Sequence, residues 1–183
     1  MLPPIIGLLG RSRSGKDTIA STILQMNSEF QIIRLSMPLK RAVCCLYDYT
    51  MDQVESASKE HIDPRWDKTP RETIQSLTDY MMGYMGRDFF SRKLFQAYDQ
   101  HLYGSHIIIP DIRYQHDVDE IQRRGGIVIK VERPNNLIQH DFEKHIDDMK
   151  GTIVFKNDQG ILELQDKIQT YILHQSKRKQ HLD

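Results

Sequence analysis

The chain carries, directly after the apolar run Ile5–Leu9, the sequence Gly10-Arg11-Ser12-Arg13-Ser14-Gly15-Lys16-Asp17-Thr18. This stretch fits the pattern G-x-x-x-x-G-K, and a helical pattern over Lys16–Met26 supplies the strand–loop–helix context that the pattern requires. Glycines let the backbone turn so that several N–H groups point at one phosphate chain, and the helix adds the positive end of its dipole. We therefore expect residues 10–18 to bind the phosphates of a nucleoside triphosphate. The alternative, a glycine turn without a ligand, leaves Lys16 without a purpose in packing.

Three side chains of this stretch have individual expected roles. Lys16 should reach the β- and γ-phosphates as a mobile point charge. The next position, commonly Ser or Thr on Mg²⁺, is Asp17, which we expect to reach magnesium directly or through water. Thr18 should hydrogen-bond the α-phosphate. For Asp17 a simpler explanation also exists, because the helix dipole alone stabilises an acidic residue in the first turn.

Apolar runs along the chain predict a parallel sheet. There are five of them: Ile5–Leu9, Ile32–Leu35, His106–Ile109, Ile127–Val131 and Thr152–Phe155. Four are rich in Ile and Val, as parallel strands covered on both faces tend to be. Helical patterns separate the strands, over Lys16–Met26, Leu39–Tyr49, Tyr114–Arg124 and Ile161–Leu173. We predict an α/β fold of the P-loop NTPase type, with five parallel strands, right-handed crossovers and helices on both faces.

Residues 50 to 103 show no strand pattern. We expect them to form a helical, acceptor-binding insertion of about fifty residues rather than a separate domain. The 183 residues would then make one domain, with a core of residues 1–49 and 104–175 and the insertion at about 50–103.

The composition of the chain bears on its binding partners and on the cellular compartment in which we expect it. The chain has 25 Lys plus Arg and 25 Asp plus Glu, so it lacks the basic excess usual in nucleic-acid binders. Its two cysteines, Cys44 and Cys45, are neighbours and offer neither a disulfide framework nor a zinc site. The first apolar run ends at Leu9, too early for a signal peptide or a membrane span. We expect a cytoplasmic protein with no nucleic-acid or membrane partner.

The ends of two predicted strands carry polar side chains. The second strand leads into Leu35-Ser36-Met37-Pro38-Leu39-Lys40, and the third into Ile109-Pro110-Asp111-Ile112-Arg113. Ligands gather at the carboxyl ends of parallel strands, so we expect Ser36 and Lys40 at the same rim as residues 10–18. Asp111 should organise Mg²⁺, and Arg113 should bridge donor and acceptor phosphates during transfer. The structural alternative is that Asp111 and Arg113 pair only with each other.

One helix of the insertion has a patterned polar face. Thr69-Pro70-Arg71 opens it, with proline in its first turn. Arg71, Gln75 and Asp79 recur every four residues and share a face, which suits a phosphate monoester and a base edge. The predicted apolar stripe opposite consists of Ile74, Leu77, Met81 and Met85. A plain solvated face explains this spacing equally well.

Together these segments resemble the deoxynucleoside monophosphate kinases of tailed phages and large DNA viruses. The resemblance covers nearly the whole chain. Besides the segments above it rests on Lys59-Glu60, His116-Asp117, Gly125-Gly126, Arg133-Pro134, His140 with Glu143, and Phe155-Lys156-Asn157-Asp158-x-Gly160. It implies a P-loop kinase with a helical acceptor region, which uses ATP and Mg²⁺ to convert a deoxynucleoside monophosphate to the diphosphate. It is also compatible with a homodimer and with a viral protein in the host cytoplasm.

The resemblance further implies roles for particular residues. Arg71 and Gln75 would hold the phosphate and base of the acceptor. Lys40 and Arg113 would neutralise charge around the transferring group, as catalytic residues beside Lys16 and Asp111. Two more residues, Arg133 and Asn157, would lie near the donor ATP. His140 and Glu143 would form part of a lid or its support.

Two features leave alternatives open. The family continues Gln-x-x-Gly-Thr-Glu, whereas this chain has Gln75-Ser76-Leu77-Thr78-Asp79, so the preferred base stays undetermined. Phe89-Phe90-Ser91-Arg92-Lys93 also resembles animal phosphomevalonate kinase, a relative whose acceptor is a phosphorylated mevalonate. The candidates are therefore a deoxynucleotide kinase, a phosphomevalonate-type kinase and a nucleotide-binding module without an acceptor.

Overall fold

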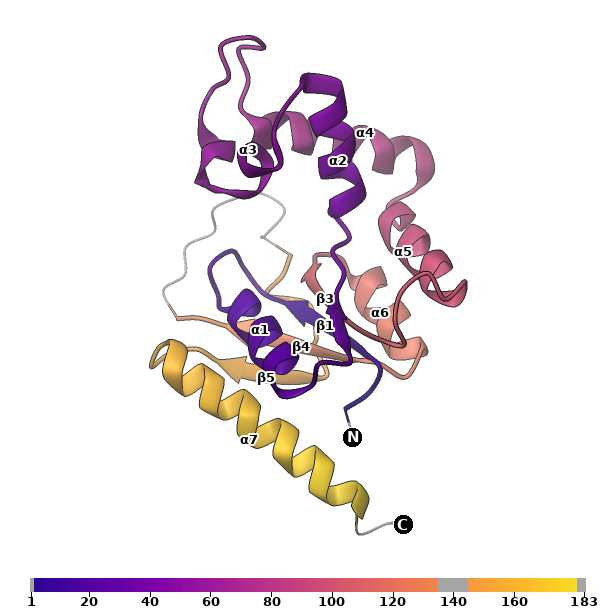
Figure 1. The fold of residues 1–183 in the computed structure, drawn as a ribbon, viewed down its shortest axis with the longest axis vertical. Coiled ribbons are helices and arrows are strands. Elements are labelled where there is room, and N and C mark those ends of the chain that lie inside the picture. The colour runs from indigo at the N-terminus through magenta and orange to yellow at the C-terminus, as the bar shows by residue number, and fades with distance from the viewer. Residues whose placement is uncertain (1, 135–144, 181–183) are drawn as a thin grey trace. The chain divides into compact units, whose positions relative to one another are not determined.

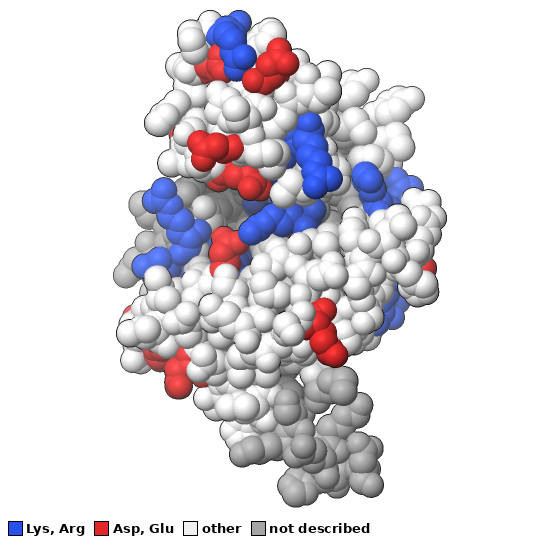
Figure 2. All heavy atoms as spheres, viewed as in Figure 1, with Lys and Arg blue, Asp and Glu red and all other residues white. Residues whose placement is uncertain are grey.

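The computed structural model describes residues 2–134 and 145–180, and the side chains of the last helix as far as His174 (Figure 1). The chain forms two compact units. One, here called the sheet unit, comprises Met1–Arg34 and Phe95–Asp183, and the other, the helical unit, comprises Leu35–Leu94. The face drawn in Figure 2 carries basic and acidic side chains interspersed, in line with a formal net charge of zero.

The sheet unit is built on five parallel strands in the order β2-β3-β1-β4-β5. The strands are β1 (Ile5–Leu9), β2 (Phe30–Ile32), β3 (His106–Ile112), β4 (Ile127–Glu132) and β5 (Ile153–Lys156). The central strand β1 pairs with β3 on one side and β4 on the other, and all five of its residues are buried. A continuous apolar sequence is what such a strand needs, since both of its faces are covered.

Helices cover both faces of this sheet. The helices α1 (Lys16–Met26) and α7 (Ile161–Gln180) lie side by side, and their buried Ile19 and Leu164 join Ile6 and Leu8 in one core cluster (Figure 1). Side chains alternate along a strand, so Gly7 faces the opposite way. A Cβ on Gly7 would lie 2.6 Å from Cδ1 of Ile121, which belongs to α6 (Gln115–Arg123). The glycine thus lets α6 approach the second face.

The helical unit contains four α-helices or parts of them and one 3₁₀ turn. These are α2 (Met37–Tyr47), α3 (Met51–Glu55), η1 (Ala57–Glu60), α4 (Pro70–Met85) and the first part of α5 (Phe89–Asp99). Val43, Tyr49 and Val54 form its buried cluster, against which Ile74 and Leu77 of α4 pack.

Two threonines set where helices of this unit begin. Thr50 precedes α3 and Thr69 precedes α4, and each hydroxyl accepts the N–H of the residue three positions on, at 3.2 Å from Gln53 and 3.1 Å from Glu72. Gln53 and Glu72 accept the threonine N–H in return, at 2.9 and 2.7 Å. Such reciprocal capping satisfies two backbone donors that the helix itself leaves open.

The predicted α/β fold with five parallel strands is confirmed, with local shifts. The second strand is Phe30–Ile32 rather than Ile32–Leu35, because Phe30 fills the core and the chain leaves the sheet after Ile33. The third strand continues past the predicted end at Ile109 to Ile112. The helix predicted over Leu39–Tyr49 is Met37–Tyr47, and it ends where Asp48 takes a left-handed φ of 53°.

Residues 50–103, all of which the structure describes, contain no strand, only an isolated bridge between Asp63 and Lys68. The compact helical unit nevertheless begins at Leu35 and ends at Leu94, a different range from the predicted insertion at about 50–103. The reason is that α2 packs through Val43 into the helical cluster. Among the described helices, none has the length and apolar character needed to cross a membrane.

Candidate active site

The phosphate loop, residues 10–15, joins β1 to α1 and needs glycine at both ends. Gly10 and Gly15 have φ of 154° and 112°. A Cβ on Gly10 would lie 2.6 Å from the carbonyl oxygen of Val131. A Cβ on Gly15 would lie 2.6 Å from Cδ2 of Leu164 and 2.9 Å from Nδ2 of Asn157. The two glycines of the sequence pattern therefore stand where only glycine fits, as the motif predicts.

Lys16 turns back over the loop it follows. Its ammonium donates to the carbonyl oxygens of Gly10 at 2.7 Å and Arg11 at 2.6 Å. The carbonyl of Arg11 also accepts the N–H of Ser14 at 3.2 Å, which closes the turn. The structure thus places the Lys16 ammonium at the start of a helix, beside a loop with the backbone form of a phosphate site.

Side chains that directly follow β4 and β5, and one from the segment between these strands, bind this loop. Arg133 donates from Nη1 to the carbonyl oxygen of Arg13 at 3.0 Å. Asn157, which is buried, donates from Nδ2 to the carbonyl oxygen of Ser14 at 2.8 Å. The resemblance placed Arg133 and Asn157 near the donor, and the structure places both on the backbone of the phosphate loop. A third partner, Asp147, forms an ion pair with the guanidinium of Arg11 and was not identified from the sequence.

Asp17 lies at the start of α1 with 78% of its side chain exposed. Its Oδ1 is 3.0 Å from Nη2 of Arg34, which follows β2. Sequence reasoning missed Arg34 because the predicted second strand, Ile32–Leu35, contained it, whereas β2 ends at Ile32. Thr18 is half-buried in the first turn, and its carbonyl accepts the hydroxyl of Thr22 at 2.9 Å.

Asp111 and Arg113 stand at the carboxyl end of β3. Leu9 pairs with Ile112, so this strand end adjoins the start of the phosphate loop, as predicted. The buried carboxylate of Asp117 accepts the N–H of Arg113 at 3.3 Å and that of Tyr114 at 3.1 Å. The start of α6 therefore fixes the backbone that carries Arg113.

The sequence singled out two carboxylates, Asp17 and Asp111, for magnesium. Within the described residues, no group of three or more His, Cys, Asp or Glu side chains is placed to hold a metal ion. Asp17 and Asp111 remain as oxygen donors from the two segments that the sequence singled out. Mg²⁺ commonly takes one or two carboxylates and completes its shell with phosphate oxygens and water, so this donor set fits a magnesium–nucleotide complex.

Four predicted acceptor residues lie in the helical unit, while a fifth, Arg113, belongs to the sheet unit. Ser36 directly precedes α2, and its carbonyl accepts the N–H of Lys40 at 3.0 Å. The Lys40 ammonium is 3.2 Å from Oε1 of Glu55. Arg71, on α4, lies 2.6 Å from Oε1 of Glu60. Both cations of this group are thus held by acidic side chains of the same unit.

The α4 faces agree with the prediction in part. Gln75 and Asp79 are exposed, while Ile74 and Leu77 pack against the helical cluster. The prediction that Met85 belongs to the apolar stripe is wrong. Met85 is 41% exposed near the end of the helix, and Met82 is buried instead. His140 and Glu143 lie outside the residues that the structure describes.

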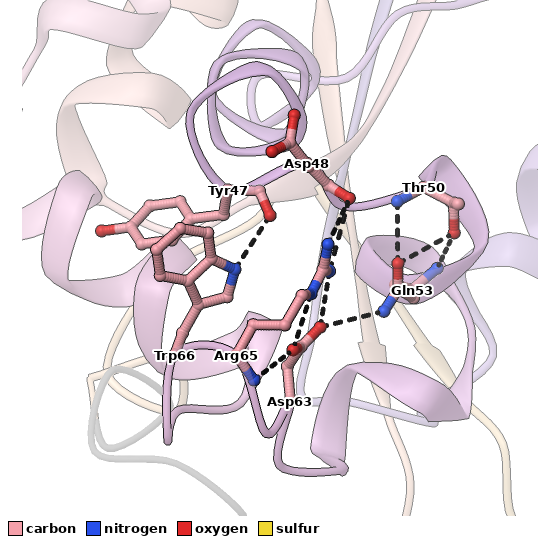
Figure 3. Close-up of polar contacts among 7 residues, drawn as sticks. All are labelled: Tyr47, Asp48, Thr50, Gln53, Asp63, Arg65 and Trp66. Carbon is pink, nitrogen blue, oxygen red and sulfur yellow. Dashed lines mark hydrogen bonds and ion pairs between the residues drawn. The ribbon is translucent and has the colours of Figure 1, made fainter.

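The helical unit also contains a polar cluster that sequence reasoning missed (Figure 3). The carboxylate of buried Asp63 accepts Nε and Nη2 of Arg65 at 2.9 and 2.7 Å, and Gln53 donates to it at 3.4 Å. Hydrogen bonds from Arg65 lower the pKa of Asp63 to about 2. Trp66 donates from Nε1 to the carbonyl oxygen of Tyr47 at 2.9 Å. The cluster ties the segment before α4 to the end of α2.

The chain is similar in sequence to proteins of one kinase family. A family model described as deoxynucleotide monophosphate kinase matches residues 62–168. A protein of Acanthamoeba polyphaga mimivirus, assigned as a deoxynucleotide monophosphate kinase, is 30% identical over 181 residues, which cover 90% of this chain and 93% of that protein.

Solved structures match the fold. Dephospho-CoA kinase from Campylobacter jejuni has a TM-score of 0.56 at 11% identity, covering 97% of this chain and 100% of that one. TT1252 from Thermus thermophilus has a TM-score of 0.54 at 15% identity, with coverage of 96% and 98%. At these identities the likeness concerns the arrangement of strands and helices alone.

Proposed function

Because this chain belongs to the deoxynucleotide monophosphate kinase family and is thus a phosphotransferase, we propose that it transfers the γ-phosphoryl group of ATP to a deoxynucleoside monophosphate, giving the diphosphate. The geometry of the phosphate loop is the observation that supports the use of ATP as the donor. Lys16 bonds two carbonyls of a loop that requires glycine at both ends. A polyphosphate offers this ammonium stronger, anionic acceptors in the same place.

In the proposed reaction the protein positions the donor and stabilises charge. Phosphoryl transfer spreads negative charge over the oxygens of the moving group, and fixed cations lower its energy. Lys16 supplies positive charge to the β- and γ-phosphates. Arg113, whose backbone N–H is fixed by Asp117, supplies it at the moving group. Gly10 to Thr18 form the binding loop for the donor, and Arg133 and Asn157, which directly follow β4 and β5, support that loop.

Magnesium, when bound, would neutralise charge on the donor phosphates, with Asp17 and Asp111 as its ligands, directly or through water. Asp17 holds the guanidinium of Arg34 at 3.0 Å, and so keeps a cation at the start of α1. Asp111 stands one position before the last residue of β3, in the strand that leads to Arg113.

The acceptor side of the proposal rests on the helical unit. Ser36, Lys40, Arg71 and Gln75 would bind the monophosphate, with Arg71 exchanging its contact to Glu60 for the acceptor phosphate. A phosphate oxygen is already anionic, so attack needs no general base. The residues' task is then to hold and orient the acceptor, which can supply a large part of the rate.

A coupled assay of ADP release with a panel of acceptors tests this function. The panel contains the deoxynucleoside monophosphates, their ribose counterparts and phosphomevalonate. We expect ADP release with at least one deoxynucleoside monophosphate. Release with phosphomevalonate alone would assign the chain to the related acceptor class. ATP binding without any acceptor-dependent release would contradict the proposed transfer and leave a nucleotide-binding module.

A further inference from the structure

A short turn, residues 145–149, lies between β4 and β5 and carries Asp147. Asp147 forms an ion pair with Arg11, the second residue of the phosphate loop, 136 positions earlier in the chain. Unlike Arg133 and Asn157, which bond backbone carbonyls of the loop, Asp147 binds a side chain. Neither the loop motif nor the spacing of the strands gave it a role.

The turn is anchored by a buried lysine. Lys130, in β4, is only 7% exposed, and its ammonium donates to the carbonyl oxygens of Asp147 at 2.7 Å and Met149 at 3.0 Å. Glu132 lies 3.6 Å from the same ammonium. Lysine is rarely buried, and its charge is tolerated there only when hydrogen bonds or a counter-charge replace water. The backbone that carries Asp147 is therefore held firmly to β4.

Packing and close approach fix the turn further. Ile146 and Met149 are buried on either side of Asp147. At Gly151, which follows the turn, a Cβ would lie 2.9 Å from Cβ of Lys130. Because β4 pairs with β1, and β1 leads into the phosphate loop, the turn and the loop belong to one framework of hydrogen-bonded strands.

Arg11 is well placed to transmit the position of Asp147 to the loop. Its carbonyl oxygen accepts both the ammonium of Lys16 at 2.6 Å and the N–H of Ser14 at 3.2 Å. A shift of Arg11 would therefore move the cation expected at the β- and γ-phosphates and open the turn that follows.

We propose that Asp147 is a positioning residue for the donor: through the Arg11 guanidinium it holds the phosphate loop in the shape that receives the triphosphate. The inference rests on the proposed function in one respect, that the loop binds ATP. Asp147 does not touch the reacting atoms. Its loss should weaken donor binding and leave acceptor binding and the rate at saturating ATP nearly unchanged.

The first test compares Asp147→Asn with its neighbour Asp148→Asn. Both replacements keep the size of the side chain and remove one negative charge, and Asp148 is exposed. Isothermal titration calorimetry gives the Kd for ATP, and steady-state kinetics give KM for each substrate and kcat. We expect Asp147→Asn to raise the Kd and KM for ATP about three- to five-fold, the effect of one exposed ion pair. Asp148→Asn should match the wild type.

A double-mutant cycle tests whether Asp147 acts through Arg11. Arg11→Met removes the guanidinium, and in that background Asp147→Asn should cause no further rise in the Kd for ATP. Arg11→Lys keeps a charge for Asp147 and should retain most of the affinity. Independent, multiplying effects of Arg11→Met and Asp147→Asn would overturn the proposal, and so would equal Kd values for Asp147→Asn and Asp148→Asn.

Failure of the inference can be told apart from failure of the proposed function. A wild type that binds ATP but turns over no monophosphate refutes the proposed function, while the comparison of Kd values still decides on Asp147. A wild type that turns over a monophosphate, with Asp147→Asn unchanged in both Kd and KM for ATP, refutes the inference alone. Thermal unfolding of each variant confirms that the compared proteins are folded.

Discussion

The ammonium of Lys16 lies on the carbonyl oxygens of Gly10 and Arg11, where it can move onto phosphate oxygens without leaving the loop. Lys16→Ala removes a charge that the transferring phosphoryl group requires, so we expect kcat to fall at least about 100-fold. The coupled assay measures it, with exposed Lys150→Ala as the control. A near-normal kcat for Lys16→Ala would contradict the mechanism.

Arg71 has a different expected effect, because it belongs to the acceptor side. It lies 2.6 Å from Glu60, and removing its guanidinium should raise the KM for the monophosphate about tenfold, since a bond between two charged groups is lost. The KM for ATP should stay near the wild-type value. Exposed Arg41→Ala, in α2, is the control. A change confined to the KM for ATP would show that α4 does not bind the acceptor.

Asp63 gives a prediction on stability against pH. Hydrogen bonds from Arg65 hold its pKa at about 2, below the ordinary value of about 3.9 in an unfolded chain. A lowered pKa in the folded state contributes stability that is fully present above about pH 4 and is lost as the pH falls toward 2. Asp63→Asn should therefore lower the urea midpoint at about pH 7 and lower it much less near pH 2.5.

The control for Asp63 is Asp67→Asn in the same segment. Asp67 is exposed and has a left-handed φ of 50°, a conformation that asparagine also tolerates. Its replacement should leave the midpoint unchanged at both pH values. An equal loss of stability at neutral and acidic pH for Asp63→Asn would show that its charge is not the cause.

Gly15, at the junction of β1 and α1, is needed for two separate reasons, its backbone conformation and the lack of space for a side chain. A variant at Gly125, between α6 and β4, separates the two effects. Gly125 has a φ of 75° and open space where a Cβ would lie, so Gly125→Ala measures backbone strain alone, about 1 kcal/mol. At Gly15 a Cβ would also lie 2.6 Å from Leu164 and 2.9 Å from Asn157. Gly15→Ala should cost ~1–3 kcal/mol more in urea unfolding, as overpacking does. Equal losses of unfolding free energy for the two variants would show that the side chains of Leu164 and Asn157 move aside without cost.

Strands and helices with strong local patterns could be predicted from the sequence. The strand Ile5–Leu9 and the helix start at Lys16 agree with the structure because apolar continuity and the glycine motif are local signals. The second strand was shifted because the apolar run Ile32–Leu35 continues after the chain has left the sheet. Burial of Phe30 decides where this strand lies in the sequence. That burial depends on contacts with distant parts of the chain, which a local pattern does not contain.

The candidate site was predictable to the same extent. The loop glycines, Lys16 and the strand-end residues Asp111 and Arg113 follow from a motif and from parallel topology. The partners of these residues do not. Arg11 and Asp147 are 136 positions apart, and Ser14 and Asn157 are 143 apart, so only the folded chain pairs them.

The protein as a whole carries no excess of either charge, and both signs mix on the face in Figure 2. The proposed binding of ATP would therefore depend on a few placed cations. ATP at about 100 times its Kd should stabilise the folded protein by about 2.7 kcal/mol, because only the folded state binds it. A thermal shift measures this gain, and Lys16→Ala should lose most of it. An equal shift in both proteins would place the bound nucleotide elsewhere.

The order of the strands has a consequence for synthesis on the ribosome. Among the described strands, β1, which is made first, pairs with β3 and β4, and the carbonyl of Ser14 accepts a hydrogen bond from Asn157, which follows β5. Domains form as units while the chain emerges from its N-terminus. A nascent chain released before Asn157 therefore lacks the side chain that holds the carbonyl of Ser14 in the phosphate loop. Prematurely terminated copies would then be inactive rather than partly active.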